Sequence, residues 1–273
     1  MKNLNTIKIF IAFATLFIMS AASYAQEGFN FGVNIQPASS SGGEMDFGLI
    51  YPSGSSYYTF DKVFTLKMNI GADFGYNFDE SLGVSSGLQY ARSGQNYANF
   101  TDSYNNTISF YTSLSYLRIP FLVHYVLNPD DQTTFSFQTG FYLGFLLSYN
   151  VDETIKLNDG STLEGLATGN SFTTSYSAGT TDNNSFVNGK PFKSVDLGMM
   201  IGLGIQYKIS NKIAMPILLN YQYGFTDIKN QTSQYSQSSS SNTELFWGKN
   251  SPNLTTPYHN SSLGIIIGLK YSL

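Results

Sequence analysis

The sequence predicts an all-β fold: an eight-stranded antiparallel up-and-down transmembrane β-barrel with four long extracellular loops and three short periplasmic turns. Three observations predict it. Apolar and polar residues alternate with a period of two in eight segments, as in strands with one apolar face. Long and short polar connections alternate between these segments. Only 12% of the 273 residues are charged, whereas about 25% is typical of a soluble domain.

The first residues have the three-part pattern of a cleaved secretory signal. A basic start precedes the apolar run 9–19, and small residues follow up to Ala25. The run is about half of the roughly 20 residues that a membrane-spanning helix needs, so an uncleaved anchor is the weaker interpretation. We expect a signal peptide over residues 1–25 and one outer-membrane β-barrel domain over residues 26–273.

The eight alternating segments are the expected strands. The second shows the pattern most clearly, because Leu66, Met68 and Ile70 alternate with small or polar residues. The apolar faces of the first four strands carry, in order, Phe31 in 28–36, Phe74 in 64–78, Leu88 in 82–92 and Phe121 in 114–126. Those of the last four carry Phe141 in 133–149, Leu203 in 194–208, Leu219 in 213–226 and Ile267 in 262–273.

The connections between these strands differ in length. Short turns rich in Asn, Asp and Ser are expected at 79–81, 128–132 and 210–212. Long polar stretches are expected to form loops at 37–61, 93–113, 150–193 and 227–261. The last includes the low-complexity Ser/Gln run 234–241, which predicts a mobile segment. Because export delivers the N-terminus to the periplasm, the short turns should face the periplasm and the long loops the cell exterior.

The apolar faces are predicted to meet lipid. A soluble barrel or sandwich would need many charges on its polar face. Here that face is mostly Gly, Ser, Asn and Gln, which suits the crowded interior of a small barrel. Tyr and Phe near the strand ends are typical of interfacial girdles, although aromatic residues also favour strands in general. With the export signal, these features predict the cell outer membrane.

Several stretches resemble a known family. Residues 116–125 (YLRIPFLVHY) resemble the Tyr-Leu-Glu-Ile-Pro-Leu-Leu-Leu-Lys-Tyr strand of the PorT-like outer-membrane β-barrel family of Bacteroidetes. Residues 140–144, 196–205 and 223–228 are similar to later strands of that family. The resemblance implies an outer-membrane barrel, and some members of the family support protein secretion or gliding. Arg118 stands where the family usually has Glu, so the family's interior ion pairs are not carried over.

Charged residues on the polar faces are expected to form an interior polar network. They are Lys67, Asp73, Arg118, Asp196, Lys208 and Lys270, with amides at Asn69, Gln138, Asn220 and Gln222. The interior of an eight-stranded barrel is filled by side chains, so this network should be a structural plug; the alternative is a narrow ion path. We expect Arg118 to pair with Asp196 or Asp73, because an unpaired buried charge is costly.

The sequence gives no support for a metal site, a cofactor or an enzyme. Cysteine is absent and the only histidines are His124 and His259, which lack metal-ligand spacing. A rim hydrolase or acyltransferase would need His259 with Asp227 and Ser261 or Ser262, and no nucleophile-elbow motif surrounds a serine. The formal charge of -4 argues against nucleic-acid binding.

We therefore expect a structural or interaction protein. Its loops or turns would contact other envelope components, including secretion proteins, and its wall would contact outer-membrane lipid and lipopolysaccharide. Residues 271–273 place an aromatic and an apolar residue two apart, similar to the end signal read by the barrel-assembly machinery. The alternative is a narrow pore or small-ligand uptake protein, and the weakest alternative is the rim enzyme.

Overall fold

The computed structural model describes most of the chain. The described residues are 28–43, 46–51, 54–59, 61–98, 100–101, 105, 107–156, 158–160, 162–169, 174–179, 185–188, 192–229, 234–238, 244–248 and 257–273. The expected signal peptide over 1–25 lies outside them. None of these residues belongs to a helix long and apolar enough to cross a membrane.

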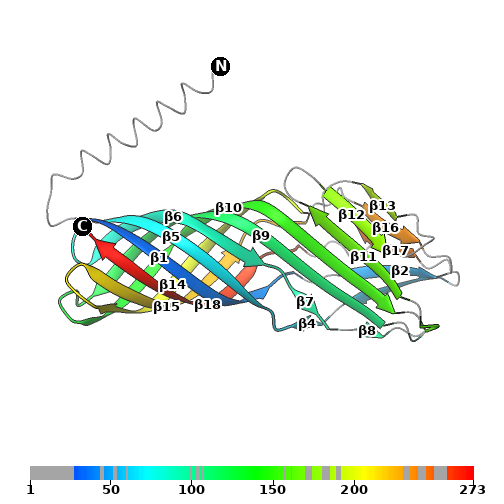
Figure 1. Cartoon of the computed structure of the whole chain (residues 1–273), viewed down its shortest axis with the longest axis horizontal. Coiled ribbons are helices and arrows are strands. Elements are labelled where there is room, and N and C mark those ends of the chain that lie inside the picture. Colours follow the sequence, from blue (N-terminus) through cyan, green and yellow to red (C-terminus); the bar gives the residue numbers. More distant parts are fainter. Residues whose placement is uncertain are drawn as a thin grey trace, which may run out of the picture.

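Eight long strands close into a ring (Figure 1). They are β1 (Phe29–Ser41), β5 (Leu66–Asn77), β6 (Leu82–Ser93), β9 (Thr107–Leu127), β10 (Thr133–Lys156), β14 (Val195–Lys208), β15 (Ile213–Gly224) and β18 (Ser261–Ser272). Each strand pairs antiparallel with the next, and β18 pairs with β1 to complete the ring. The predicted eight-stranded antiparallel barrel is confirmed.

The three short turns also lie where the sequence predicts them, and the C-terminus lies at the same end of the barrel (Figure 1). In the first turn, Asp79 Oδ1 accepts hydrogen bonds from the backbone N–H groups of Ser81 and Leu82, both at 2.7 Å. In the second, Asn128 adopts a φ of 52°. Both are common functions of Asp and Asn in tight turns. We call this end of the barrel the turn side and the opposite end the outer side.

The long connections contain further strands rather than loops alone. The strands β9 and β10 continue past the barrel, and β11 (Thr162–Gly169) and β12 (Thr174–Gly179) extend the sheet from β10. A separate sheet contains β13 (Ser185–Asn188), β16 (Gln234–Ser238), β17 (Glu244–Gly248), β2 (Asp46–Tyr51) and β3 (Gly54–Thr59). The short strands β4 (Lys62–Val63), β7 (Asn96–Tyr97) and β8 (Phe100–Thr101) pair near β9.

The Ser/Gln run differs from its prediction as a mobile segment. Its first residues, 234–238, form β16, which pairs with β13 on one side and β17 on the other. Both edges of β16 therefore have backbone hydrogen-bond partners, so tertiary pairing overrides a weak intrinsic strand preference. The remaining residues of the run, 239–241, lie outside the described part of the chain.

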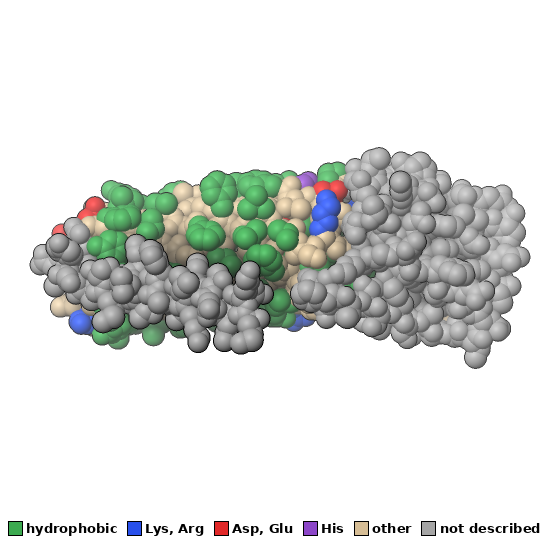
Figure 2. All heavy atoms as spheres, turned by 90° about the horizontal axis from the view of Figure 1, so that it is seen from above, with side chains coloured by type: hydrophobic (Ala, Val, Ile, Leu, Met, Phe, Trp, Pro, Cys, Tyr) green, Lys and Arg blue, Asp and Glu red, His purple; other side chains and the backbone are tan. Residues whose placement is uncertain are grey.

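The barrel wall has the predicted orientation. Apolar residues stand out from its surface, where Figure 2 shows them spread over the barrel. Val33 and Leu203 are 60% and 59% exposed, whereas Asn30 and Asn220 on the opposite face are fully buried. Lipid, not water, suits such a surface. The interior is less purely polar than expected, because it also contains Tyr116, Tyr142, Leu146, Met200, Leu218 and Ile266.

Candidate functional site

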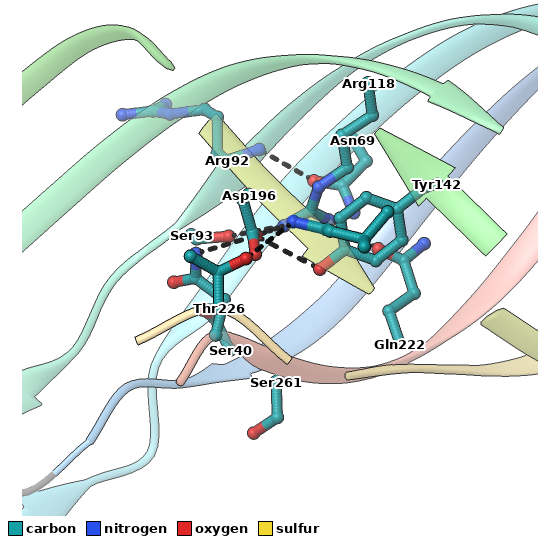
Figure 3. A network of polar contacts seen from close by, with 12 residues as sticks. Ser40, Asn69, Arg92, Ser93, Arg118, Tyr142, Asp196, Gln222, Thr226 and Ser261 are labelled. Carbon is teal, nitrogen blue, oxygen red and sulfur yellow. Dashed lines mark hydrogen bonds and ion pairs between the residues drawn. The ribbon is translucent and has the colours of Figure 1, made fainter. Parts of the chain in front are cut away.

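The outer half of the barrel interior contains a buried ion pair. Arg118 Nη2 lies 3.8 Å from Asp196 Oδ2, and both side chains are almost completely inaccessible. The same Asp196 oxygen accepts hydrogen bonds from Tyr142 Oη and Asn260 Nδ2, each at 3.1 Å. Figure 3 shows Arg118, Tyr142 and Asp196 converging. Gly144 of β10 pairs with Arg118 on one side and Asp196 on the other, so no side chain separates the two charges.

The Arg118 guanidinium is held by several neighbours. Its Nη1 donates to Gln222 Oε1 at 2.5 Å, and its Nη2 donates to Ser93 Oγ at 3.1 Å. The guanidinium carbon lies 4.5 Å from the ring centre of Tyr142 and 5.6 Å from that of Tyr116. Cation–π contacts and charge-assisted hydrogen bonds offset the cost of burying the charge.

An amide cluster lies beside this ion pair. Gln36 Oε1 accepts from Gln89 Nε2 at 3.2 Å and from Gln222 Nε2 at 3.0 Å. It also accepts from Asn69 Nδ2 at 3.5 Å, and Gln36 Nε2 donates to Asn220 Oδ1 at 3.2 Å. These residues come from β1, β5, β6 and β15, so the cluster joins walls that lie apart in the ring. The interior is filled at this level by mutually bonded side chains.

The outer mouth is capped by Tyr258, which is fully buried just before β18. Its hydroxyl lies 3.1 Å from Thr112 Oγ1, and its backbone N–H donates to Asp227 Oδ1 at 2.9 Å. Its ring packs 6.2 Å from that of Phe192, and Gly42 leaves room for it, since a Cβ atom there would collide with the ring. Burial raises the pKa of Tyr258 to about 12.

The turn-side half of the interior is different, because it contains a cavity of about 90 Å³. Asn34, Asp73, His124 and Lys270 line it. Asn34 Nδ2 donates to Asp73 Oδ1 at 3.1 Å, and His124 Nε2 lies 2.8 Å from Asn77 Oδ1. No ion pair joins Asp73 to Lys270 among the side chains that the structure describes.

The six charged residues expected in one network thus occupy several places. Arg118 and Asp196 meet in the outer half, and Asp73 and Lys270 line the cavity. Lys67 Nζ lies 3.4 Å from Tyr111 Oη and forms no ion pair with either group among the described residues. Lys208 lies near the turns and donates to the carbonyl of Pro129.

The histidine at the rim does not form a catalytic relay with the residues expected beside it. His259 stacks on Tyr223 with ring centres 5.6 Å apart. Asp227 Oδ1 accepts from backbone N–H groups, and Ser261 Oγ donates to the carbonyl of Ser41. Ser262 Oγ is buried and has no hydrogen-bond partner within the described residues. The residues that the structure describes contain no cluster of three or more His, Asp or Glu suited to a metal ion.

Several residues of the interior were not singled out by the sequence. Gln36 is the last residue of its expected strand, Ser93 is the first residue of a stretch expected to be a loop, and Tyr142 lies on the polar face of a strand rich in aromatic residues. Tyr258 lies in a stretch expected to be a loop. Alternation assigns such residues to a face, but it does not show which faces meet across the barrel.

The sequence matches a known family. The family described as "Outer membrane protein beta-barrel domain" matches residues 17–230. A search of the curated proteins finds no match.

Solved structures of outer-membrane proteins are also similar. The outer membrane protein OprG from Pseudomonas aeruginosa is 10% identical, with a TM-score of 0.45 over 91% of this chain and 96% of that chain. Neisserial surface protein A is 11% identical, with a TM-score of 0.30 over 89% and 96%. Ail, the attachment invasion locus protein of Yersinia pestis, is 11% identical, with a TM-score of 0.29 over 89% and 99%.

Proposed function

This chain belongs to the outer membrane protein beta-barrel domain family and resides in the outer membrane, and we propose that it acts there as a structural or interaction protein rather than as a pore. The observation that carries the proposal is the length of two strands. β9 has 21 residues and β10 has 24, whereas β5 and β15 have 12 each. About 9–11 tilted residues cross the hydrocarbon, so β9 and β10 extend well beyond it.

The part that projects is a paired sheet. We call residues 107–113 of β9 and 150–156 of β10, together with β11 and β12, the outer extension. Its strands are joined by continuous antiparallel pairing, for example Thr107 with Lys156 and Thr162 with Lys156. Among the described strands, β12 is the edge strand of this sheet. An edge strand can pair with an extended segment of another protein, so the outer extension suits contact with other envelope or secretion components.

The interior supports the choice of an interaction protein over the alternative, a narrow pore or small-ligand uptake protein. The Arg118–Asp196 pair and the amide cluster around Gln36 fill the outer half, and Tyr258 caps its mouth. A continuous aqueous path would require these buried groups to separate. The proposal assigns no catalysis and no cofactor to the protein; at the rim, His259 stacks on Tyr223 and is not hydrogen-bonded to Ser262.

We also infer that the chain is a PorT-like member of its family, of the Bacteroidetes type. The resemblance of residues 116–125, which lie in β9, supports this. Its further partners would be outer-membrane lipid and lipopolysaccharide around the wall, and the barrel-assembly machinery during insertion. The export signal over residues 1–25 belongs to the same proposal.

Crosslinking in intact cells tests the interaction directly. A photo-crosslinking residue would replace Asp152, which is exposed on the outer extension, and in a matched variant Asp131, which is exposed in a short turn. We expect the Asp152 variant to yield discrete crosslinked proteins, identified by mass spectrometry, that the Asp131 variant does not. Planar-bilayer recordings should show no stable conductance. A large, stable conductance together with no crosslinked protein would favour the pore instead.

A further inference from the structure

The cavity on the turn side is separate from the filled outer half. Gln89 lines the cavity and also donates to Gln36, so the amide cluster closes its outer end. Lys270 lies two residues before the end of β18, which places the other end of the cavity near the turns. Asp73 and Lys270 are partly exposed, whereas Gln36 and Gln89 are buried. Solvent therefore approaches the charged groups from the turn side.

One wall of the cavity carries two opposite charges. Gly32 of β1 pairs with Asp73 of β5 on one side and with Lys270 of β18 on the other. The Asp73 carboxylate lies over Gly32, where a Cβ atom would be 2.7 Å from its Oδ2. Although the carboxylate leans toward β18, it forms no ion pair with Lys270. Both charges thus face the same space without neutralising each other by direct contact.

The opposite wall is partly apolar, although His124, Ser136 and Gln138 also line it. Gly140 of β10 pairs with Leu122 of β9 and with Met200 of β14, and both of these side chains line the cavity. In the ring, β10 lies four strands from β1 in either direction, so the two walls face each other. Leu218 and Ile266 line the cavity beside Met200. All three side chains are buried, so the cavity offers a dry apolar contact opposite its two charged groups.

We infer that this cavity binds a small zwitterion with a short apolar group, of the class and size of alanine. The ligand's ammonium group lies at Asp73, its carboxylate at Lys270, and its apolar group against Leu122 and Met200. Asn34 and Gln138 supply amide hydrogen-bond partners along the wall. A cavity of about 90 Å³ is smaller than the engineered cavity of about 150 Å³ that takes benzene, so larger solutes do not fit wholly inside it.

The separation of the two charges favours a zwitterion over a simple ion. A simple anion at Lys270 would be repelled by the Asp73 carboxylate. A simple cation at Asp73 would be repelled by the Lys270 ammonium group. A divalent metal ion prefers several oxygen ligands, and among the described residues Asp73 is the only carboxylate that lines the cavity. The site opens to the turn side and uses no residue of the outer extension, so it stands apart from the proposed interaction function.

The test titrates L-alanine into the full-length protein, folded in an uncharged maltoside detergent, and follows binding by calorimetry and by amide NMR shifts. Three related solutes each lack one feature: propionate lacks the ammonium group, ethylamine the carboxylate and glycine the methyl group. We expect saturable 1:1 binding of alanine. Propionate and ethylamine should bind about tenfold more weakly or worse, because each loses a charge-assisted contact. Glycine should bind more weakly by a smaller factor.

Matched variants locate the site. Asp73→Asn and Lys270→Gln should each weaken alanine binding about tenfold. Met200→Ser should reduce the difference between alanine and glycine. Asp131→Asn and Lys212→Gln make the same charge changes at exposed turn positions and should leave binding unchanged. Folding of each variant is checked by circular dichroism, and the solute series on the unaltered protein needs no variant at all.

Two outcomes would overturn the inference. The first is the absence of saturable alanine binding to the unaltered, folded protein. The second is binding of propionate or ethylamine with the affinity of alanine, because one charge would then suffice. Neither outcome bears on the crosslinks expected at Asp152, so failure of this site and failure of the proposed function are distinguishable.

Discussion

In the outer half of the barrel, Gly144 lies between Arg118 and Asp196 on the flanking strands. In the turn-side half, on the opposite side of the ring, Gly32 lies between Lys270 and Asp73. Each arrangement has a base and an acid on either side of a residue without a side chain. The outer pair approaches to 3.8 Å and is sealed from solvent, but the turn-side pair makes no ion pair and lines a cavity.

The difference lies in the neighbours of each pair. Asp196 receives hydrogen bonds from Tyr142 and Asn260, and Arg118 donates to Gln222 and Ser93. Asp73 has a single side-chain partner, Asn34, among the described residues. Two buried charges stabilise the folded protein only when hydrogen bonds from several strands help to offset the free-energy cost of removing both charges from water. An acid and a base placed on either side of a glycine therefore do not by themselves form an ion pair that fills the barrel interior.

The largest expected effect comes from removing one partner of the outer pair. Arg118→Ala leaves Asp196 buried and unpaired, which should lower the free energy of unfolding by about 3–5 kcal/mol. Urea unfolding in lipid vesicles measures this. The double variant Arg118→Met with Asp196→Leu should recover most of the loss, because it removes both charges. If Arg118→Ala were as stable as the unaltered protein, the outer half would not be sealed as described.

The next largest effect compares the loss of stability when a glycine in each half, Gly198 or Gly32, is replaced by alanine. A Cβ atom at Gly198 would lie 2.3 Å from the Tyr223 carbonyl and 2.5 Å from the Tyr142 ring, so Gly198→Ala should cost about 1–3 kcal/mol of unfolding free energy. At Gly32 the three atoms nearest to an added Cβ atom all belong to the Asp73 carboxylate, which can turn away. Gly32→Ala should cost under about 1 kcal/mol, but it should weaken alanine binding. Equal losses of stability would contradict the contrast between the halves.

A smaller effect is expected at the outer cap. Tyr258→Phe removes the hydroxyl that lies 3.1 Å from Thr112 Oγ1, with little change in volume. The free energy of unfolding should fall by about 0.5–1.5 kcal/mol, the usual worth of one hydrogen bond. Planar-bilayer recordings should remain silent, because the ion pair and amide cluster below the cap are intact. A conducting Tyr258→Phe variant would show that the cap alone seals the barrel.

The smallest effect on stability is expected in the turn-side half. Asp73→Asn removes a partly exposed charge that has no ion-pair partner in the described structure, so the free energy of unfolding should change by no more than about 0.5 kcal/mol. The same urea titration measures it. A loss as large as that of Arg118→Ala would show that Asp73 and Lys270 form a structural pair rather than a binding wall.

Much of the fold could be predicted because each barrel strand has one lipid face. Alternation around residues such as Leu66, Met68 and Ile70 fixes the face, and short polar turns fix the direction of the next strand. The strands beyond the barrel could not be predicted in this way. Residues 234–238 contain one aromatic residue among four polar ones and no run of alternating apolar residues, and β16 exists because β13 and β17 pair with it.

The interior could be predicted less well. The sequence placed six charged residues on the polar faces, and the expected partners of Arg118 included Asp196, which the structure places next to it. It did not separate Asp73 and Lys270 from that pair. Which side chains meet across the ring depends on register and on tyrosines such as Tyr142, whose position on a polar face gives no signal of its function.

The central contrast, a filled outer half and an accessible turn-side half, can be tested with cysteine labelling, since the chain has no cysteine of its own. Ser93 and Ser136 are similarly buried, at 3% and 8% exposure, but Ser93 contacts Arg118 and Ser136 lines the cavity. Single variants Ser93→Cys and Ser136→Cys would be treated with methyl methanethiosulfonate and followed by mass spectrometry. We predict rapid modification at position 136 and almost none at 93. Equal rates at the two positions would contradict the account.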